Sequence, residues 1–412
     1  MNISQIVERL RYWGWRGAVD FAEGKVRDRL RRWAFAVNAI AHPMRPKRGV
    51  TIVGHISSRN SISKVLRDLI VALKNAGVPY QTFDLDGTGE VANAEVASAL
   101  TSRKAFRALR YSHVFEMFDG VFPALPGVRR HRIAFWEFDT GLFEAVQQLK
   151  SARSLIAMSD FNAEVFRKEA SKGVRVSKLL YPFLRLDSSD LPSATEMRQR
   201  FGIPTQAFVV FFNFDFGSSF SRKNPDGALR AFAEALRSVP DAFLVFKTMQ
   251  SKSHPDKLAS LMQLAGELGV ANRFVCVNNY LSTRELYGLT AACDCYLSLH
   301  RGEGFGLGIA EAMSLGKPAV VTDYSSTTEF CNLSNSMPIP YRLVEVPPEM
   351  HDLPSYRFVR QWAEPDILAA AAALRRLYDD RLFCVELGER AARSVSEQFS
   401  SGKFKESINR LM

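Results

Sequence analysis

The chain has 412 residues, which is long for one ordinary domain and suits two domains of roughly 200 residues each. Apolar residues make up 47% of the chain and charged residues 24%, a composition typical of a globular protein and not of a disordered one. No apolar run approaches the roughly 20 residues that a membrane-spanning helix needs, and the N-terminus lacks the pattern of a signal peptide.

The five cysteines are odd in number and all lie in the second half of the chain: Cys276, Cys293, Cys295, Cys331 and Cys384. Their spacing fits neither a zinc site nor a disulfide framework. We therefore expect free thiols in a reducing cytosol.

Positive charge is concentrated at the N-terminus. Residues 1–49 carry +7 of the net charge of +11, because they hold eleven basic and four acidic residues. Residues 3–40 show apolar stripes at helical spacing and contain Trp13, Trp15 and Trp33. Arginine attracts anionic lipid, tryptophan favours the headgroup boundary, and no nucleic-acid-binding module is recognisable. We expect residues 1–48 to form a basic amphipathic helical extension on an anionic membrane surface, with packing against the protein or an oligomer interface as the alternative.

Residues 49–185 alternate between predicted strands and helices. Short apolar runs predict strands at 50–53, 80–85, 113–115, 132–136, 154–158 and 177–181, and residues 62–76 carry an apolar face at helical spacing. Strands that are separated by helices pair in parallel, so a first α/β domain is expected here. The polar stretch 186–204 would be a linker.

The same plan repeats over residues 205–392. Predicted strands at 208–212, 243–248, 274–277, 295–299 and 319–322 are separated by predicted helices at 225–237, 255–268, 284–292 and 309–315. The sequence therefore predicts an α/β protein with two parallel sheets.

A glycine-rich loop between a buried strand and a helix is the most informative stretch. Residues 300–313 are His-Arg-Gly-Glu-Gly-Phe-Gly-Leu-Gly-Ile-Ala-Glu-Ala-Met. Backbone N–H groups at a helix N-terminus bind anions such as a diphosphate. The residues that would present them are Gly304, Phe305, Gly306 and Leu307.

Two carboxylates flank this predicted anion site. Glu311 lies four residues beyond Leu307, about 6 Å up the helix, where it can accept two hydrogen bonds from a ribose diol. Glu303 precedes the helix and can accept hydrogen bonds from sugar hydroxyls. A dinucleotide fingerprint is excluded, because neither Gly-x-Gly pair is followed by glycine or alanine at the required position. A helix-capping turn is the simpler alternative.

The spacing of Glu303 and Glu311, with Gly-Phe-Gly-Leu between them, is where the chain resembles family 4 of the retaining glycosyltransferases, the glycosyl transferases of group 1. Other segments that resemble this family are 212–215, 221–225, 318–323, 362–366 and 388–391, with 136–137 and 159–161 in the first half. The resemblance spans residues 50–400 and is most specific in the second half.

The resemblance implies the GT-B fold, in which two Rossmann-like domains face each other across a cleft and a C-terminal helix, here 393–412, crosses back to the first. It implies transfer of a hexose or deoxyhexose, with a mannose-type sugar favoured, from a nucleoside-diphosphate sugar with retention of configuration. No cofactor or metal would be required. The backbone near Asn279 and Tyr280 would select the base.

The implied acceptor is a glycan or a lipid-linked glycan, as in surface polysaccharide or lipopolysaccharide biosynthesis, so the enzyme would be cytoplasmic and peripheral on the inner face of the membrane. A nucleotide-sugar epimerase of the same fold and a catalytically silent, membrane-tethered binding subunit remain the alternatives.

Three cations are candidates for contact with the diphosphate. Arg222 and Lys223 precede a helix that Asn224 would cap and Pro225 would begin. They would neutralise the leaving group in place of a divalent metal, and such charge stabilisation is usually the largest catalytic contribution. Lys247 ends a predicted strand, a position suited to ligand contact.

In the first half, His113, Trp136 and Glu137 are predicted at strand ends that face the cleft, because ligands gather at the carboxyl ends of parallel strands. His113 would orient or deprotonate an acceptor hydroxyl, and Trp136 and Glu137 would contact the acceptor. Core roles remain open for His113 and Trp136. Asp84 and Asp86 form the Asp-x-Asp pair that holds a metal in the other major glycosyltransferase fold, but here a turn is favoured.

Overall fold

The computed structural model describes residues 46–58, 60–85, 110–117, 127–142, 149, 152–183, 190–350 and 354–412. Residues 1–45 of the predicted helical extension and Asp86 lie outside the described residues. Lys47, which the prediction placed in that extension, is instead the first residue of a strand.

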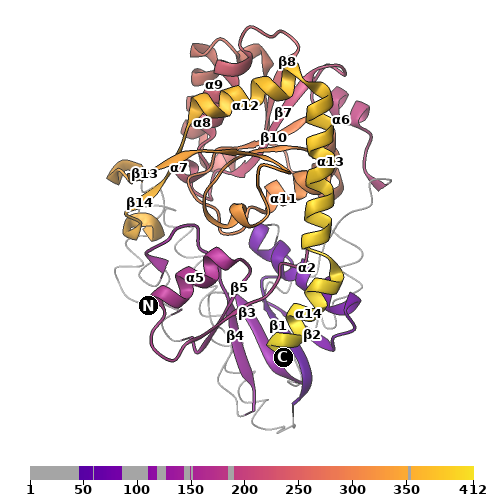
Figure 1. Ribbon diagram of the computed structural model, residues 1–412, viewed down its shortest axis with the longest axis vertical. Helices are drawn as coiled ribbons and strands as arrows, with labels where there is room; N and C mark the ends of the chain where they lie inside the picture. Colours follow the sequence, from indigo (N-terminus) through magenta and orange to yellow (C-terminus); the bar gives the residue numbers. More distant parts are fainter. Residues whose placement is uncertain are drawn as a thin grey trace. The chain divides into compact units, whose positions relative to one another are not determined.

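Two sheets of six strands organise the chain (Figure 1). The first has the order β2-β1-β3-β4-β5-β6, with β1 (Lys47–Gly54), β2 (Tyr80–Asp84), β3 (Tyr111–Met117), β4 (Arg129–Ile133), β5 (Ser154–Ala157) and β6 (Arg175–Lys178). The second has the order β12-β11-β10-β7-β8-β9, with β7 (Phe208–Asp215), β8 (Ala242–Met249), β9 (Phe274–Val277), β10 (Cys295–Ser298), β11 (Ala319–Thr322) and β12 (Met337–Ile339). Strand β1 pairs in parallel with β2 and β3, and β7 pairs in parallel with β8 and β10.

Helix α2 (Ser61–Asn75) connects β1 to β2, close to the predicted range 62–76. The Asn60 side chain caps it by accepting a hydrogen bond from the amide of Ser63 (2.8 Å). Its inner face buries an apolar stripe that includes Leu66, Leu69 and Ile70. The stripe has the spacing of three and four residues that predicted the helix.

The remaining helices belong mainly to the second half of the chain. They are α5 (Asp160–Glu169), α6 (Ala194–Arg200), α7 (Phe220–Lys223), α8 (Pro225–Leu236), α9 (Pro255–Glu267), α10 (Thr283–Ala291), α11 (Leu307–Ser314), α12 (Ile367–Asp379), α13 (Arg381–Gln398) and α14 (Ser401–Leu411). A two-stranded antiparallel hairpin, β13 (Tyr341–Glu345) and β14 (Gln361–Pro365), is an addition that the sequence did not predict.

Contacts divide the chain after Ile133 into one unit of residues 1–133 with Met412 and another of residues 134–411. This division differs from the predicted linker at 186–204. Residues that follow β5 make close contacts with the second half, and these contacts explain the difference. The hydroxyl of Ser159 lies 3.0 Å from that of Ser326, and Glu329 accepts a hydrogen bond from the amide of Phe161 (3.0 Å).

The C-terminal segment forms two helices, because α13 ends at Gln398 and α14 begins at Ser401. The hydroxyl of Ser407 on α14 accepts a hydrogen bond from the amide of Leu180, two residues beyond β6 (3.0 Å). The sequence predicted one helix over 393–412, with a contact of this kind to the first half of the chain.

The core of the second sheet is aromatic, with Phe208, Phe211, Phe212 and Phe246 buried. The rings of Phe212 and Phe246, on neighbouring strands, meet edge to face at 5.5 Å. Two parallel six-stranded sheets with helices constitute the GT-B fold, which confirms the predicted fold class for the described residues. Within that part of the chain, every helix is too short or too polar to cross a membrane.

Candidate active site

The glycine-rich loop joins β10 to α11, as predicted, and its glycines are required by close contacts. Gly306 has a φ of 88° and occupies the N-cap position of α11. A side chain at Gly308 would lie 2.6 Å from the amide oxygen of Asn213 and 2.7 Å from the hydroxyl of Tyr296. A side chain at Gly302 would collide with the carbonyl oxygen of Glu137. The loop therefore packs tightly against its neighbours on two sides.

Arg222 and Lys223, which we call the basic segment, are the last two residues of α7, directly before α8. Asn224 caps α8 by accepting a hydrogen bond from the amide of Gly227 (3.1 Å), and Pro225 is its first residue, so this prediction is confirmed. The Asn224 side chain also donates a hydrogen bond to the carbonyl of Leu299 (2.9 Å). This second bond ties the basic segment to the start of the glycine-rich loop.

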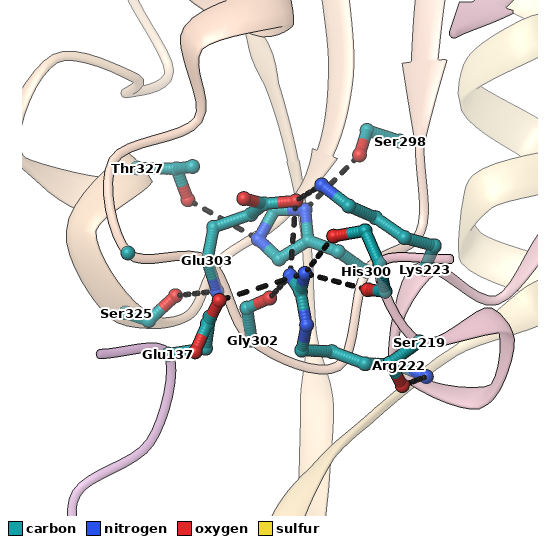
Figure 2. Close-up of polar contacts among 12 residues, drawn as sticks. Glu137, Ser219, Arg222, Lys223, Ser298, His300, Gly302, Glu303, Ser325 and Thr327 are labelled. Carbon is teal, nitrogen blue, oxygen red and sulfur yellow. Dashed lines mark hydrogen bonds and ion pairs between the residues drawn. The ribbon is translucent and has the colours of Figure 1, made fainter. Parts of the chain in front are cut away.

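Glu303 lies between the two cations of this segment (Figure 2). One carboxylate oxygen accepts a short hydrogen bond from the Lys223 ammonium and lies 3.4 Å from the guanidinium of Arg222. Burial opposes ionisation of this carboxyl, but the two cations outweigh burial and lower its pKa to about 2. Glu303 is therefore a carboxylate at neutral pH and accepts hydrogen bonds without donating one.

The guanidinium of Arg222 is only 2% exposed, and its contacts are with the protein. It donates hydrogen bonds to the carbonyl oxygens of Gly302 (2.7 Å) and Ser218 (3.0 Å), and it lies 3.6 Å from the carboxylate of Glu137. Arg222 is thus enclosed by protein groups, and its predicted contact with a diphosphate stays a prediction. Lys223, whose side chain is 17% exposed, is the better placed of the two cations.

Neighbouring residues fix the position of Glu303. Its amide donates a hydrogen bond to the hydroxyl of Ser325 (2.8 Å), a residue with a φ of 66°. Such a left-handed conformation costs energy in a non-glycine residue and marks a constrained site. His300 is fully buried, and its Nδ1 lies 3.1 Å from the hydroxyl of Ser298. Burial lowers the pKa of His300 to about 4, so the imidazole is neutral at physiological pH.

Glu311 is the fifth of the eight residues of α11, and its carboxylate accepts a hydrogen bond from the hydroxyl of Tyr287 on α10 (2.9 Å). Lys247 lies on β8 two residues before its end, where its ammonium donates a hydrogen bond to the Thr248 carbonyl (2.6 Å). Burial lowers the pKa of Lys247, while nearby Cys276 opposes that change.

Asn279 and Tyr280 follow β9 and are exposed. The predicted contact of their backbone with a nucleotide base stays a prediction, as do the ligand contacts expected of Lys247 and Glu311.

Glu137 and Trp136 were the predicted acceptor-binding residues. The carboxylate of Glu137 lies beside the guanidinium of Arg222, whereas Trp136 is a core residue. Trp136 is 3% exposed, its indole N–H donates to the Thr140 carbonyl (2.8 Å), and its backbone is held by the side chain of Asn162. Two aromatic rings pack edge to face against it, so the core role that the sequence left open is the one observed, and the contact with an acceptor stays a prediction.

His113 is the third residue of β3 and not its end. It pairs with Val50 and Arg129, stacks on His131 at 5.4 Å and is buried, which lowers its pKa. The strand extends to Met117 because buried Glu116 forms ion pairs with arginines of β4. The prediction that His113 lies at a carboxyl strand end is therefore wrong, and a role in contacting an acceptor loses its structural basis.

Asp84 is the last residue of β2 and not part of a turn. Its carboxylate accepts a hydrogen bond from the amide of Ile56 (3.0 Å) and another from the hydroxyl of Ser57. The side chain thus holds the loop after β1. Within the described ranges, no group of three or more His, Cys, Asp or Glu side chains is arranged to hold a metal ion.

Sequence reasoning did not identify His300, Ser325 or Tyr287 as parts of the site. Each of these side chains is buried, and a buried polar residue has no distinctive sequence pattern. His300 was visible only as the first residue of the glycine-rich loop.

Residues 193–334 match the family model described as Glycosyl transferases group 1. The match covers less than half of the chain, but it includes the basic segment, the glycine-rich loop and Glu311. The chain has no significant match among curated proteins.

Solved structures with the same fold cover most of the chain. The Anabaena protein HepE in complex with UDP and glucose is 15% identical, with a TM-score of 0.60 over 89% of this chain and 99% of that one. Sucrose-phosphate synthase from Thermosynechococcus elongatus is 13% identical, with a TM-score of 0.60 over 89% and 98%. A glycosyltransferase from Rickettsia africae is 13% identical, with a TM-score of 0.58 over 89% and 98%. At these identities the similarity shows the fold alone.

Proposed function

We propose that the chain is a glycosyltransferase that moves a hexose or deoxyhexose from a nucleoside-diphosphate sugar to a glycan or lipid-linked glycan, with retention of configuration. The observation that carries this proposal is the buried cluster of Glu303, Lys223 and Arg222 beside the N-terminus of α11. The cluster lies within the segment that matches Glycosyl transferases group 1.

The parts of the donor would bind one after another along the glycine-rich loop and α11. The diphosphate would bind at the N-terminus of α11, where the backbone N–H groups and the helix dipole favour an anion. Lys223 would leave Glu303 and pair with the diphosphate, and the freed carboxylate of Glu303 would accept hydrogen bonds from the sugar hydroxyls. Glu311, oriented by Tyr287, would accept hydrogen bonds from the ribose.

The protonation states in the site favour a reaction without a protein base. Glu303 is already ionised and committed to cations, and His300 is buried in its neutral form. The acceptor oxygen would attack the anomeric carbon on the face from which the diphosphate departs. The bond to the diphosphate breaks with its electrons on the leaving oxygen, and that oxygen takes the acceptor proton. Lys223 and the helix end would stabilise the departing charge without a metal.

Two donors are the first to test. HepE, which shares the fold, was crystallised with UDP and glucose, so UDP-glucose is one, and a mannose donor such as GDP-mannose is the other, because the family resemblance favours a mannose-type sugar. The acceptor would belong to surface polysaccharide biosynthesis.

Transfer is tested by incubating the full chain with UDP-glucose or GDP-mannose and simple alkyl glycosides, with and without a chelator. We expect release of the nucleoside diphosphate and, by NMR, a product with the anomeric configuration of the donor. A product of inverted configuration would contradict retention. Conversion of the donor to an epimer without transfer would support the epimerase alternative, and complete inertness would support a silent binding subunit.

Peripheral attachment to the cytoplasmic face of a membrane is the second part of the proposal, and it depends on the sequence of residues 1–48. The full chain should pellet with anionic vesicles in preference to neutral ones, since arginines near a surface contribute about 1 kcal/mol each. A variant that begins at Pro43 should lose this preference. Equal pelleting of both proteins with anionic vesicles would contradict the membrane role.

A further inference from the structure

The hairpin β13–β14 meets both halves of the site. Its strands pair from Tyr341 opposite Pro365 to Glu345 opposite Gln361, and the segment between the strands carries Tyr356. Figure 1 places the hairpin beside α7, the helix that carries the basic segment. The hairpin accounts for a group of contacts that the proposed transfer reaction does not use.

Strand β14 fixes the loop through Arg301, the neighbour of His300. The Arg301 guanidinium forms two hydrogen bonds with the carboxylate of Glu364, at 2.5 and 2.9 Å, and lies over the ring of Trp362 at 4.8 Å. It also donates a hydrogen bond to the Ser221 carbonyl (2.5 Å). A two-pronged arginine–carboxylate pair of this kind has a defined geometry that lysine does not reproduce.

Backbone hydrogen bonds join the same three segments. The amide of Arg301 donates to the carbonyl of Arg222 (2.8 Å), and the amide of Ala363 donates to the carbonyl of Arg301 (3.2 Å). The basic segment, the glycine-rich loop and β14 therefore form one continuous hydrogen-bonded unit.

Tyr356 reaches the site from the connecting segment. It is 5% exposed, and its ring packs edge to face against Trp136 (5.9 Å) and Phe138 (5.0 Å). Burial raises the pKa of the Tyr356 hydroxyl, and the neighbouring guanidinium of Arg222 opposes that change. Tyr356 thus links Arg222 to the segment that carries Glu137.

We propose that Tyr356 and Glu364 are positioning residues for transfer, which the hairpin uses to hold Arg222 and, through it, the carboxylate of Glu303. The inference rests on the proposed function. Because the two Nη atoms of Arg222 contact the Gly302 and Ser218 carbonyls and the carboxylates of Glu303 and Glu137, its role is to fix these carboxylates, while Lys223 meets the diphosphate. Electrostatic stabilisation requires charges that are held in place before the reaction, so a displaced Arg222 slows turnover even when the donor still binds.

Tyr356→Phe tests the hydroxyl, because it keeps the ring against Trp136 and Phe138. We expect kcat to fall on the order of tenfold or more, with the KM for the donor and the Tm unchanged, since small misplacements of reacting groups cost up to about a hundredfold. The matched control is Tyr341→Phe, which removes a hydroxyl from the same hairpin at an exposed position and should leave kcat at the wild-type value.

Glu364→Gln tests the ion pair with Arg301. We expect a lower kcat and faster hydrogen exchange in residues 219–223 and 300–304, measured on the full chain by mass spectrometry. Exchange is independent of activity, so it judges the hairpin even if the wild-type protein transfers no sugar and the proposed function fails. Wild-type kcat and exchange in both variants, or a fall in kcat that only follows a fall in Tm, would overturn the inference.

Discussion

Each sheet has an acid at or beyond the carboxyl end of a parallel strand, but the partners of these two acids differ. Asp84 is the last residue of β2, and its carboxylate accepts hydrogen bonds from Ile56 and Ser57 of the adjacent loop. After β10, the carboxylate of Glu303 is satisfied by Lys223 and Arg222, which come from another loop and are ionic partners. The hydrogen bonds described for Asp84 come from neutral groups, whereas Glu303 contacts two cations.

The difference in partners suggests a structural role for Asp84 and supports the proposed ligand-binding role of Glu303. Hydrogen bonds from a backbone amide and a hydroxyl stabilise a loop and have no reason to exchange for a ligand. An ion pair in which Lys223 is partly exposed can exchange its partner for a diphosphate, because the ligand brings charge of the same sign as the carboxylate it replaces. We therefore expect substitutions at the two sites to have different effects.

The largest effect is expected from Glu303→Gln, which keeps the size of the side chain and removes its charge. Loss of a charged hydrogen-bond partner costs about 1.5–3 kcal/mol, so turnover should fall roughly ten- to a hundredfold. Steady-state kinetics with a defined donor measure this, with Glu389→Gln on the exposed face of α13 as the control. Equal kcat values for Glu303→Gln and wild type would remove Glu303 from the mechanism.

A smaller and different effect is expected at Glu311. Because the proposed partner of Glu311 is the ribose, which does not react, Glu311→Ala should raise the dissociation constant for the donor by roughly tenfold and leave kcat nearly unchanged. Tyr287→Phe removes the hydroxyl that orients Glu311 and should give a weaker effect of the same kind. A fall in kcat at constant donor affinity would contradict the ribose assignment.

The burial of His300 beyond β10 can be tested through the pH dependence of the free energy of unfolding. Its pKa of about 4 lies below the ordinary value of 6.5, because the imidazole is buried. Between these values the unfolded chain binds a proton that the folded protein does not, so stability should fall as pH falls from 6.5 to 4. The slope due to this group is at most about 1.4 kcal/mol per pH unit, and His300→Asn should remove it. Denaturant titrations at several pH values measure it, and parallel curves for the two proteins would contradict the assignment.

The smallest effect is expected from Asp84→Asn. Weaker capping of the loop should cost about 1 kcal/mol of unfolding free energy, and transfer activity should be unchanged. Activity that is lost in this variant, or that requires manganese in the wild type, would instead indicate a metal role for Asp84.

The sequence predicted the parts of this protein in which local pattern and burial agree. Strands β9 and β11 and the cap of α8 by Asn224 and Pro225 were predicted at their observed positions, because apolar runs and capping chemistry are local signals. The glycine-rich loop was predicted for the same reason. Its glycines are needed where the backbone passes close to Glu137, Asn213 and Tyr296.

The contacts that decide the site were not predictable in this way. Arg222 and Lys223 look equivalent in sequence, yet Arg222 is enclosed by carbonyl oxygens and Lys223 is not. The β13–β14 hairpin was missed because β13 is largely exposed and carries no apolar alternation toward a core. His113 was misplaced because ion pairs keep the charged residue Glu116 inside β3.

The most direct test is the binding of a nucleoside diphosphate, followed by thermal unfolding of the wild type and of Lys223→Ala with a chelator present. The wild type should be stabilised by roughly 2.7 kcal/mol at a ligand concentration a hundred times the dissociation constant, and Lys223→Ala should lose most of that gain at the same concentration. Stabilisation that appears only with added magnesium or manganese, or that is equal in the two proteins, would contradict a diphosphate site built on Lys223 and the N-terminus of α11.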